Sequence, residues 1–157
     1  MFKTLYGNKT AVIIRGFSGS GKSTVAQTIA EEAAFNDCSV AIHETDNFFM
    51  TQNGYIFDGS MLGCYHSKNL ESFCNSVDSG IHLIINSNTN VEYWEFSQYI
   101  KYASKNGYNI QIIDLYDNGL SDSALHERNL HGFPKDKYQL CRDRYERTYD
   151  NVRSNPH

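Results

Sequence analysis

The segment that most constrains this chain is Gly16-Phe17-Ser18-Gly19-Ser20-Gly21-Lys22-Ser23, which matches the pattern G-x-x-x-x-G-K-[S/T]. An uninterrupted apolar run at residues 11–14 precedes the motif and predicts a buried parallel strand. Residues 24–33 follow it with the apolar spacing of an amphipathic helix. Strand, glycine-rich loop and helix thus occur in the order that a phosphate-binding loop requires. A chance turn of glycines and serines does not account for that order.

The composition of this loop fits the phosphates of ATP or GTP. Glycines let the backbone wrap closely around phosphate oxygens and turn its N–H groups inward. The helix that follows begins with free N–H groups and the positive end of its dipole. We expect Lys22 to approach the β- and γ-phosphates and the Ser23 hydroxyl to bind Mg²⁺. The expected nucleotide contacts are Gly16, Ser18, Gly19, Ser20, Gly21, Lys22, Ser23 and Thr24.

Length and composition predict one cytoplasmic domain spanning residues 1–157. The formal charge of −4 argues against tight non-specific binding of a long duplex. Neither a signal segment nor an apolar run of roughly 20 residues is present, so we expect no contact with a membrane. The sequence leaves the oligomeric state open. Reduced thiols, and neither zinc nor a redox pair, are expected because no C-x-x-C spacing joins Cys38, Cys64, Cys74 and Cys141.

Strand and helix patterns alternate along the chain, which predicts parallel βαβ units. The expected fold class is α/β, a three-layer α/β/α sandwich of the P-loop NTPase type with four or five parallel strands. A helical lid is expected at about residues 117–134. After the first strand, loop and helix at about 10–35, the predicted strands are 39–43, 81–85 and 108–114, and the predicted helices are 60–77, 91–105, 121–130 and 135–151.

A polar and aromatic segment follows the second predicted strand, at the sheet edge where ligands bind in open α/β folds. Asp46 in this segment could accept the proton of an acceptor hydroxyl, or bind Mg²⁺ through water. The alternative is a turn or helix-cap aspartate. Phe48 and Phe49 could stack on a base or sugar, or could belong to the core. Together with Tyr55, they are our candidate acceptor-binding residues on this side.

The polar segment after the third predicted strand stands where P-loop proteins usually carry a carboxylate for the metal, and it holds no acidic residue. Asn88 or Ser87 could hydrogen-bond a water bound to Mg²⁺. We therefore expect Ser23, waters and phosphates to hold the ion. Asn90 is predicted to cap the next helix. Asn88 and Thr89 complete the candidate acceptor-binding set.

Several arginines lie in the predicted C-terminal helices, and Arg128 is the best lid candidate. Its short helix is bounded by helix breakers, as a movable lid would be. An arginine over the γ-phosphate stabilises charge in the transition state. The alternative for any such arginine is a solvated helix face. Arg142 and Arg144 are weaker candidates, since their segment also fits surface ion pairing.

Taken together, five segments resemble the AAA-type P-loop kinases that include bacteriophage polynucleotide 5′-kinase and the ATPase domain of NEDD-binding proteins. The resemblance runs from about Val12 to Glu146 and implies a kinase fold, a general base at Asp46 and a lid arginine at Arg128. The segments are the P-loop, residues 45–49, residues 88–90 with 94–95, residues 125–132 and residues 144–146.

The chain departs from the polynucleotide kinases at three places. They carry a basic residue soon after the catalytic aspartate, where this chain has Phe48, Phe49 and Met50. They also carry a second lid arginine, absent from residues 129–132, and an aspartate where Asn88 stands.

We therefore expect a kinase that transfers the γ-phosphate of ATP to a hydroxyl of a nucleic acid, modified base or nucleoside. Lys22, Asp46 and Arg128 are its expected catalytic residues. Two alternatives stay open: a nucleotide-binding or ATPase module that acts as a switch or binds a partner, and a kinase of a small metabolite or sugar nucleotide.

Overall fold

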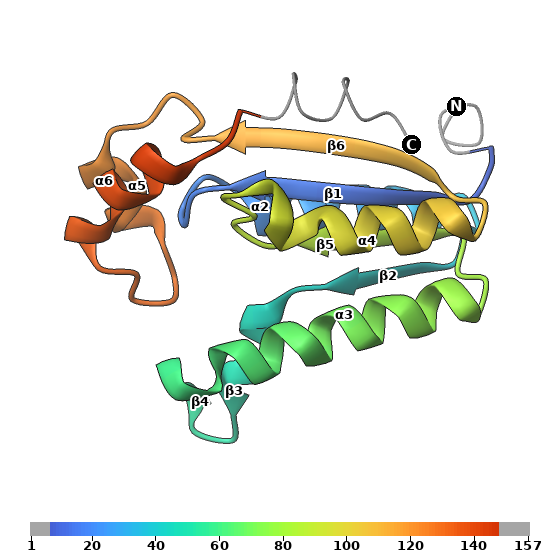
Figure 1. Cartoon of the computed structure of the whole chain (residues 1–157), viewed down its shortest axis with the longest axis horizontal. Coiled ribbons are helices and arrows are strands. Elements are labelled where there is room, and N and C mark those ends of the chain that lie inside the picture. The colour runs from blue at the N-terminus through green and yellow to red at the C-terminus, as the bar shows by residue number, and fades with distance from the viewer. Residues whose placement is uncertain (1–6, 148–157) are drawn as a thin grey trace.

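A four-stranded parallel sheet forms the centre of the molecule in the computed structural model, which describes residues 7–147. The apolar runs recognised in the sequence form these strands, because a strand covered by helices on both faces must be apolar throughout. Their order across the sheet is β2-β5-β1-β6 (Figure 1). The strands are β1 (Thr10–Gly16), β2 (Val40–His43), β5 (Leu83–Ser87) and β6 (Asn109–Tyr116).

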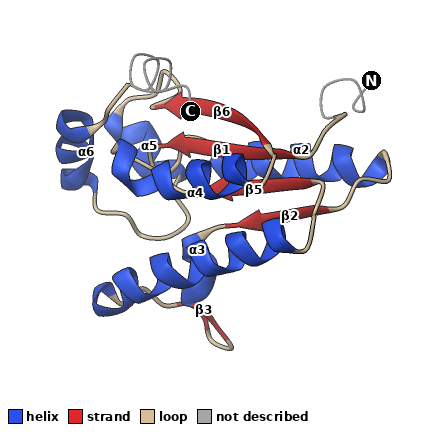
Figure 2. Cartoon of the chain, turned by 45° about the vertical axis from the view of Figure 1, so that its right-hand side comes forward, coloured by secondary structure: helices blue, strands red, loops and turns tan. Residues whose placement is uncertain are grey.

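Helices cover both faces of the sheet, which confirms the three-layer α/β/α prediction (Figure 2). On one face, α2 (Lys22–Phe35) packs its buried alanines against Val12 and Ile14. On the other, α3 (Leu62–Asp78) and α4 (Tyr93–Lys105) pack against Ala11 and Ile13. Successive residues of β1 thus enter opposite cores, as the pleat of a strand requires.

The remaining elements gather near the carboxyl edge of the sheet. Helices α5 (Asp122–Arg128) and α6 (Tyr138–Arg144), with the 3₁₀ turn η3 (Lys135–Lys137), lie beyond the ends of β1 and β6 (Figure 1). They enclose a third core built around Phe17 of the glycine-rich loop. A small hairpin projects beside α3, and its elements are η1 (Thr45–Phe49), β3 (Met50–Thr51), β4 (Gly54–Tyr55) and η2 (Gly59–Met61).

Several predicted boundaries are wrong, and three of them concern β5, α6 and α4. Strand β5 runs two residues later than predicted, because Asn86 and Ser87 pair with Ile13 and Ile14 instead of opening the polar loop. Helix α6 ends at Arg144, and residues 145–147 are not helical. The predicted continuation to residue 151 passes outside the described residues after 147.

The third error concerns the start of α4. This helix is capped by Glu92, whose side chain and that of Glu95 form a reciprocal capping box. Asn90, the predicted cap, is instead buried in a left-handed conformation with φ of 48°.

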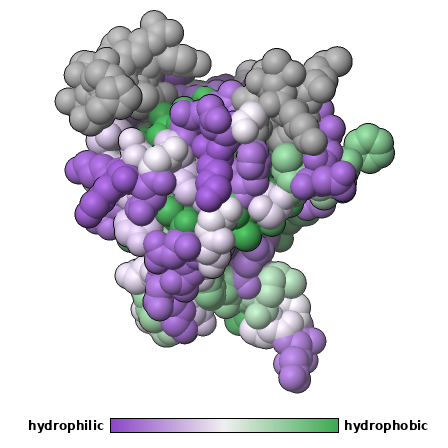
Figure 3. Space-filling view, turned by 90° about the vertical axis from the view of Figure 1, so that its right-hand side faces the viewer, coloured by the Kyte–Doolittle hydropathy of each residue, from purple (hydrophilic) through white to green (hydrophobic). Residues whose placement is uncertain are grey.

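The end of the molecule at the amino edge of the sheet carries a mixed surface in which hydrophilic residues predominate (Figure 3). Among the described residues, no helix is both long and apolar enough to cross a membrane.

Candidate active site

The glycine-rich loop joins β1 to α2 and approaches the C-terminal helices closely. Gly19 and Gly21 have φ of 87° and 102°, values that favour glycine. A Cβ on Gly19 would lie 2.2 Å from the carbonyl oxygen of Leu125 in α5. The Tyr138 hydroxyl of α6 donates to the Ser18 carbonyl at 2.8 Å. The C-terminal helices therefore fix the shape of this loop from outside.

Lys22 and Ser23 lie at the start of α2, as the motif predicted. The Lys22 ammonium donates to the Phe17 carbonyl at 3.0 Å, across the loop. Burial lowers the pKa of Lys22 to about 8, although Asp46 and Glu44 oppose that shift. The exposed Ser23 hydroxyl donates to the Glu44 carboxylate at 3.3 Å. A hydroxyl beside a carboxylate offers the hard oxygen ligands that Mg²⁺ takes, so these residues fit the ion.

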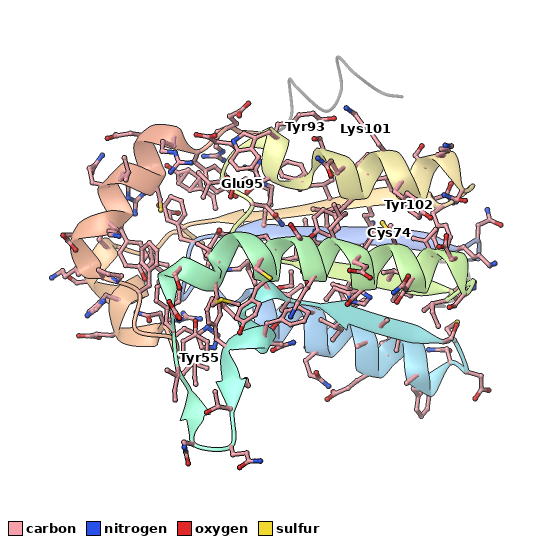
Figure 4. The ribbon with its side chains drawn as sticks, turned by 60° about the horizontal axis from the view of Figure 1, so that its bottom comes forward. Tyr55, Cys74, Tyr93, Glu95, Lys101 and Tyr102 are labelled. Atoms are coloured by element: carbon pink, nitrogen blue, oxygen red, sulfur yellow. The ribbon has the colours of Figure 1, made fainter. Side chains whose placement is uncertain are left out.

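Asp46 lies in η1, directly after β2, and both of its carboxylate oxygens have partners. The Tyr55 hydroxyl donates to Oδ1 at 3.0 Å, and Nδ1 of His131 lies 3.1 Å from Oδ2. The Tyr55 and His131 rings stack with centroids 4.3 Å apart. Burial, and then the Asp46 charge, raise the pKa of Tyr55, so its hydroxyl stays a donor. Tyr55 lies between the hairpin and the C-terminal helices in Figure 4.

The two phenylalanines after Asp46 pack against neighbouring rings. Phe49 is 2% exposed and contacts the rings of Tyr55, Phe57 and Tyr65. It is therefore a core residue, one of the two readings left open by the sequence. Phe48 is half-buried and stacks on Tyr65 with centroids 5.5 Å apart. These rings form an aromatic cluster, which lies beside Asp46 because Tyr55 contacts both Phe49 and the Asp46 carboxylate.

Residues 86–90 form internal ties. Oδ1 of Asn88 accepts from the Thr45 backbone N–H at 2.9 Å, and its Nδ2 donates to Asn86. The Thr89 carbonyl accepts from the Gly16 N–H at 3.2 Å. Asn90 donates to the Ile14 carbonyl at 3.0 Å. The segment thus joins β5 to β1 and to η1, next to the phosphate-binding loop.

Arg128 lies at the end of α5 and reaches the glycine-rich loop. Its Nη2 lies 3.8 Å from the position that a Cβ on Gly21 would take. The turn after it is held by Asn129, whose side chain donates to the His126 carbonyl and accepts from the Phe133 N–H. The structure therefore brings Arg128 to the loop that also carries Lys22.

Arg142 and Arg144 are held in ion pairs, and the Arg142 guanidinium also lies 5.3 Å from the ring centroid of Phe17 in the loop. Arg142 contacts the Asp117 and Asp122 carboxylates at 2.7 and 2.8 Å, and Arg144 contacts Glu92 at 2.8 Å. Ion pairing was the alternative that the sequence offered for both, although their partners come from other elements.

Sequence reasoning did not single out Glu44 or His131. Glu44 stands two residues before Asp46, so its place at the end of β2 was a usable signal. His131 was seen only as part of a segment lacking an arginine. Its proximity to Asp46 depends on the path of the lid, which local sequence does not encode.

The whole chain is similar to known proteins in sequence and in fold. No protein-family model matches the chain. NEDD4-binding protein 2 of Homo sapiens is 32% identical over 147 residues, a match that covers 92% of this chain. The chain corresponds to only 8% of the length of that protein. The predicted similarity to NEDD-binding proteins is thereby confirmed at the level of sequence.

Solved structures agree on the architecture. Chaetomium thermophilum Kti12 in complex with ADP-AlF3 has a TM-score of 0.62 and 13% identity, covering 91% of this chain and 84% of its own. A chain of the Pnkp1/Rnl/Hen1 complex has a TM-score of 0.57 and 18% identity, with coverages of 77% and 39%. Mycobacterium tuberculosis APS kinase in complex with AMPPNP and APS has a TM-score of 0.51 and 18% identity, with coverages of 69% and 62%.

This chain has a P-loop kinase fold. Identities below 25% establish the fold and leave the substrate undetermined. Two of these neighbours were solved with nucleotides, AMPPNP in one and ADP-AlF3 in the other.

Proposed function

We propose that the protein is a kinase that transfers the γ-phosphate of ATP to a hydroxyl of a nucleic acid, modified base or nucleoside. The observation that carries the proposal is the convergence of Lys22, Asp46 and Arg128 on one edge of the sheet. Arg128 reaches the loop that carries Lys22, and Asp46 lies two residues after Glu44, whose carboxylate is 3.3 Å from the Ser23 hydroxyl of the same loop. A donor site and a candidate base therefore lie side by side.

In the proposed reaction, the acceptor oxygen attacks the γ-phosphorus in line. The new O–P bond forms as the bond to the β–γ bridging oxygen breaks, leaving ADP. The acceptor proton passes to Asp46, whose oxygens each keep a further lone pair beside the contacts with Tyr55 and His131. Lys22 and Arg128 neutralise charge on the transferring group. When bound, Mg²⁺ adds positive charge at the β- and γ-phosphate oxygens.

The aromatic side chains beside Asp46 favour an acceptor that contains a ring, such as a nucleobase. The rings of Tyr55 and His131 lie beside the carboxylate, and aromatic rings stack on nucleobases irrespective of sequence. The absence of a basic residue directly after Asp46, where residues 47–50 are neutral, favours a nucleoside or an exposed base over a long phosphate backbone. With its cysteines free in the structure, the chain fits the reducing cytoplasm.

A nucleotide-binding or ATPase module is the second candidate. The occupied oxygens of Asp46 and the neutral residues at the end of β5 favour it. In that case the protein would bind ATP, or hydrolyse it, without labelling an acceptor.

Asp46→Asn tests the role of the base. We expect phosphate transfer to fall at least about 100-fold, the usual contribution of a general base, with ATP affinity nearly unchanged. Transfer from γ-labelled ATP to a panel of polynucleotides, nucleosides and small alcohols measures the first quantity, and calorimetry measures the second. Asp37→Asn, at an exposed turn after α2, is the matched control and should behave like the wild type.

Full transfer by Asp46→Asn would refute its role. A wild type that releases only free phosphate would support the ATPase, and one that binds ATP without turnover would support the binding module.

A further inference from the structure

We propose that Glu44 supplies the carboxylate of the Mg²⁺ site, replacing the acidic residue that is missing from the end of β5. The inference rests on the proposed binding of a magnesium nucleotide at the glycine-rich loop. It changes the sequence-based expectation, in which Ser23, waters and phosphates held the ion without a protein carboxylate.

The geometry places Glu44 beside the expected metal ligand. Glu44 follows the last residue of β2, and Ser23 lies in the first turn of α2. Their side chains meet with Ser23 Oγ 3.3 Å from Glu44 Oε1. An ion bound by the Ser23 hydroxyl is therefore within reach of this carboxylate, directly or through one bound water.

The residues at the conventional position cannot take this part. Asn88 is neutral, and both ends of its amide are engaged, by the Thr45 N–H and by Asn86. Asn86 and Ser87 are buried within β5. Their side chains bring no charge to the ion. Of the polar groups at the end of β5, none matches a carboxylate for binding a doubly charged cation.

Asp46 is engaged in a different task. One carboxylate oxygen accepts from the Tyr55 hydroxyl and the other lies beside His131. Its contacts are therefore with the hairpin and with the chain after α5. Glu44 instead contacts the helix that begins at the phosphate-binding loop. The two acidic residues of this short segment therefore have different roles. Glu44 binds the metal ion, and Asp46 accepts the proton of the acceptor.

The site also explains why the metal should arrive with the nucleotide. In the described part of the chain, no group of three or more histidine, cysteine or acidic side chains could hold a metal by itself. Mg²⁺ commonly uses one or two carboxylates together with substrate phosphates. Without the ion, Glu44 would repel the phosphates. Glu44 thus favours the magnesium complex over the free nucleotide.

Glu44→Gln tests the proposal with Mn²⁺ as the probe, since Mn²⁺ takes the same hard oxygen ligands. Electron paramagnetic resonance of free Mn²⁺ in the presence of AMPPNP gives the metal dissociation constant. We expect the variant to raise that constant about 10- to 100-fold, the usual cost of losing a supporting metal contact. Calorimetry without metal should show AMPPNP binding that is unchanged or tighter, because a negative charge has gone.

Glu31→Gln is the matched control, since Glu31 is exposed on the same helix as Ser23. It should leave Mn²⁺ affinity unchanged. Wild-type Mn²⁺ affinity in Glu44→Gln would overturn the proposal. So would an equal loss of nucleotide binding with and without metal, which would mark a structural defect.

The outcome is separable from that of the proposed kinase activity. If the wild type binds Mn²⁺ and AMPPNP through Glu44 but labels no acceptor, the metal site stands and the kinase assignment fails. If acceptor labelling depends on Asp46 but Glu44→Gln leaves Mn²⁺ affinity unchanged, the kinase assignment holds and the proposed metal site is wrong.

Discussion

Asp46 shows how much a single residue depends on its neighbours. A carboxylate on a short 3₁₀ turn would rotate freely, yet here a phenol and an imidazole from different elements hold both of its oxygens. Stacking of the Tyr55 and His131 rings fixes those donors relative to each other. This arrangement holds the candidate base in one orientation.

Tyr55→Phe removes one of these contacts and keeps the ring. We expect kcat for transfer to fall about 10- to 100-fold, because a small misplacement of a reacting group has that cost, with ATP affinity unchanged. Steady-state kinetics and calorimetry separate the two effects. Tyr102→Phe is the control, because the Tyr102 hydroxyl also donates a hydrogen bond to a carboxylate, that of Asp78. Figure 4 shows Tyr102 at the opposite end of the molecule from Tyr55. Equal losses in both variants would argue against positioning.

Helices and strands were predictable from the sequence where apolar runs determine their position. Their ends were less predictable where single polar contacts determine them. Four strands and the helices between them follow from periodicity, and β1 with its loop follows from the motif. The end of β5 was missed because Asn86 and Ser87 are polar, although the sheet buries them. The start of α4 was missed because Asn90 stabilises β1 instead of a helix terminus.

The site divides in the same way. The motif located Lys22 and Ser23, and the end of β2 located Asp46. Glu44 had a usable signal in its place at the end of β2, whereas Tyr55 and His131 come together only through the path of the hairpin and of the chain after α5. Those paths are set by long-range packing such as the contact of α5 with Gly19, which no local pattern contains.

The tie between α3 and η1 should depend on pH. Nδ1 of His66 on α3 lies 2.9 Å from the Thr45 hydroxyl, next to Asp46. Burial lowers the pKa of His66 below its usual 6.5, although the Asp46 charge opposes this. The unfolded chain then binds the proton more readily than the folded one. The stability from this site is therefore complete above about pH 6.5 and is lost as pH falls toward the lowered pKa.

His66→Gln should remove this contribution. We expect urea midpoints measured from pH 8 to pH 5 to fall less steeply for the variant than for the wild type. Circular dichroism at pH 8 checks that the variant folds. Parallel curves for the two proteins would contradict the assignment.

At the scale of the whole molecule, Arg15 joins the sheet to the segment that follows α6. The residue is fully buried at the end of β1, one position before the glycine-rich loop. Its guanidinium donates to the carbonyls of Asn90, Val91 and Glu146 at 2.6–2.9 Å. It also lies 4.2 Å from the Tyr145 ring centroid. Burial lowers the pKa of Arg15, an effect that nearby Tyr145 and Asp114 oppose.

This cation connects the segment after α6 to the strand that carries the phosphate-binding loop. Since α6 also contacts that loop through Tyr138 and Ser18, the C-terminal helices and the glycine-rich loop share one support. Nε, Nη1 and Nη2 of the planar arginine fork reach three separate carbonyls, whereas the donors of a lysine all lie on one nitrogen. A charge inside an apolar strand thus has a structural explanation that hydropathy alone does not give.

Arg15→Met should therefore destabilise the fold far more than loss of a surface charge. We expect the free energy of unfolding in urea to fall by about 3–5 kcal/mol, because the variant also breaks the buried ion pair of Arg15 with Asp114, 3.4 Å away. Hydrogen exchange should rise at residues 90–91 and 138–146, before the rest of the sheet opens. Arg144→Gln, which removes the exposed pair with Glu92, should cost much less. Suppose that both variants lost similar stability and that hydrogen exchange rose uniformly along the chain. Arg15 would then be one contact among many, and the C-terminal helices would be held by their own apolar core.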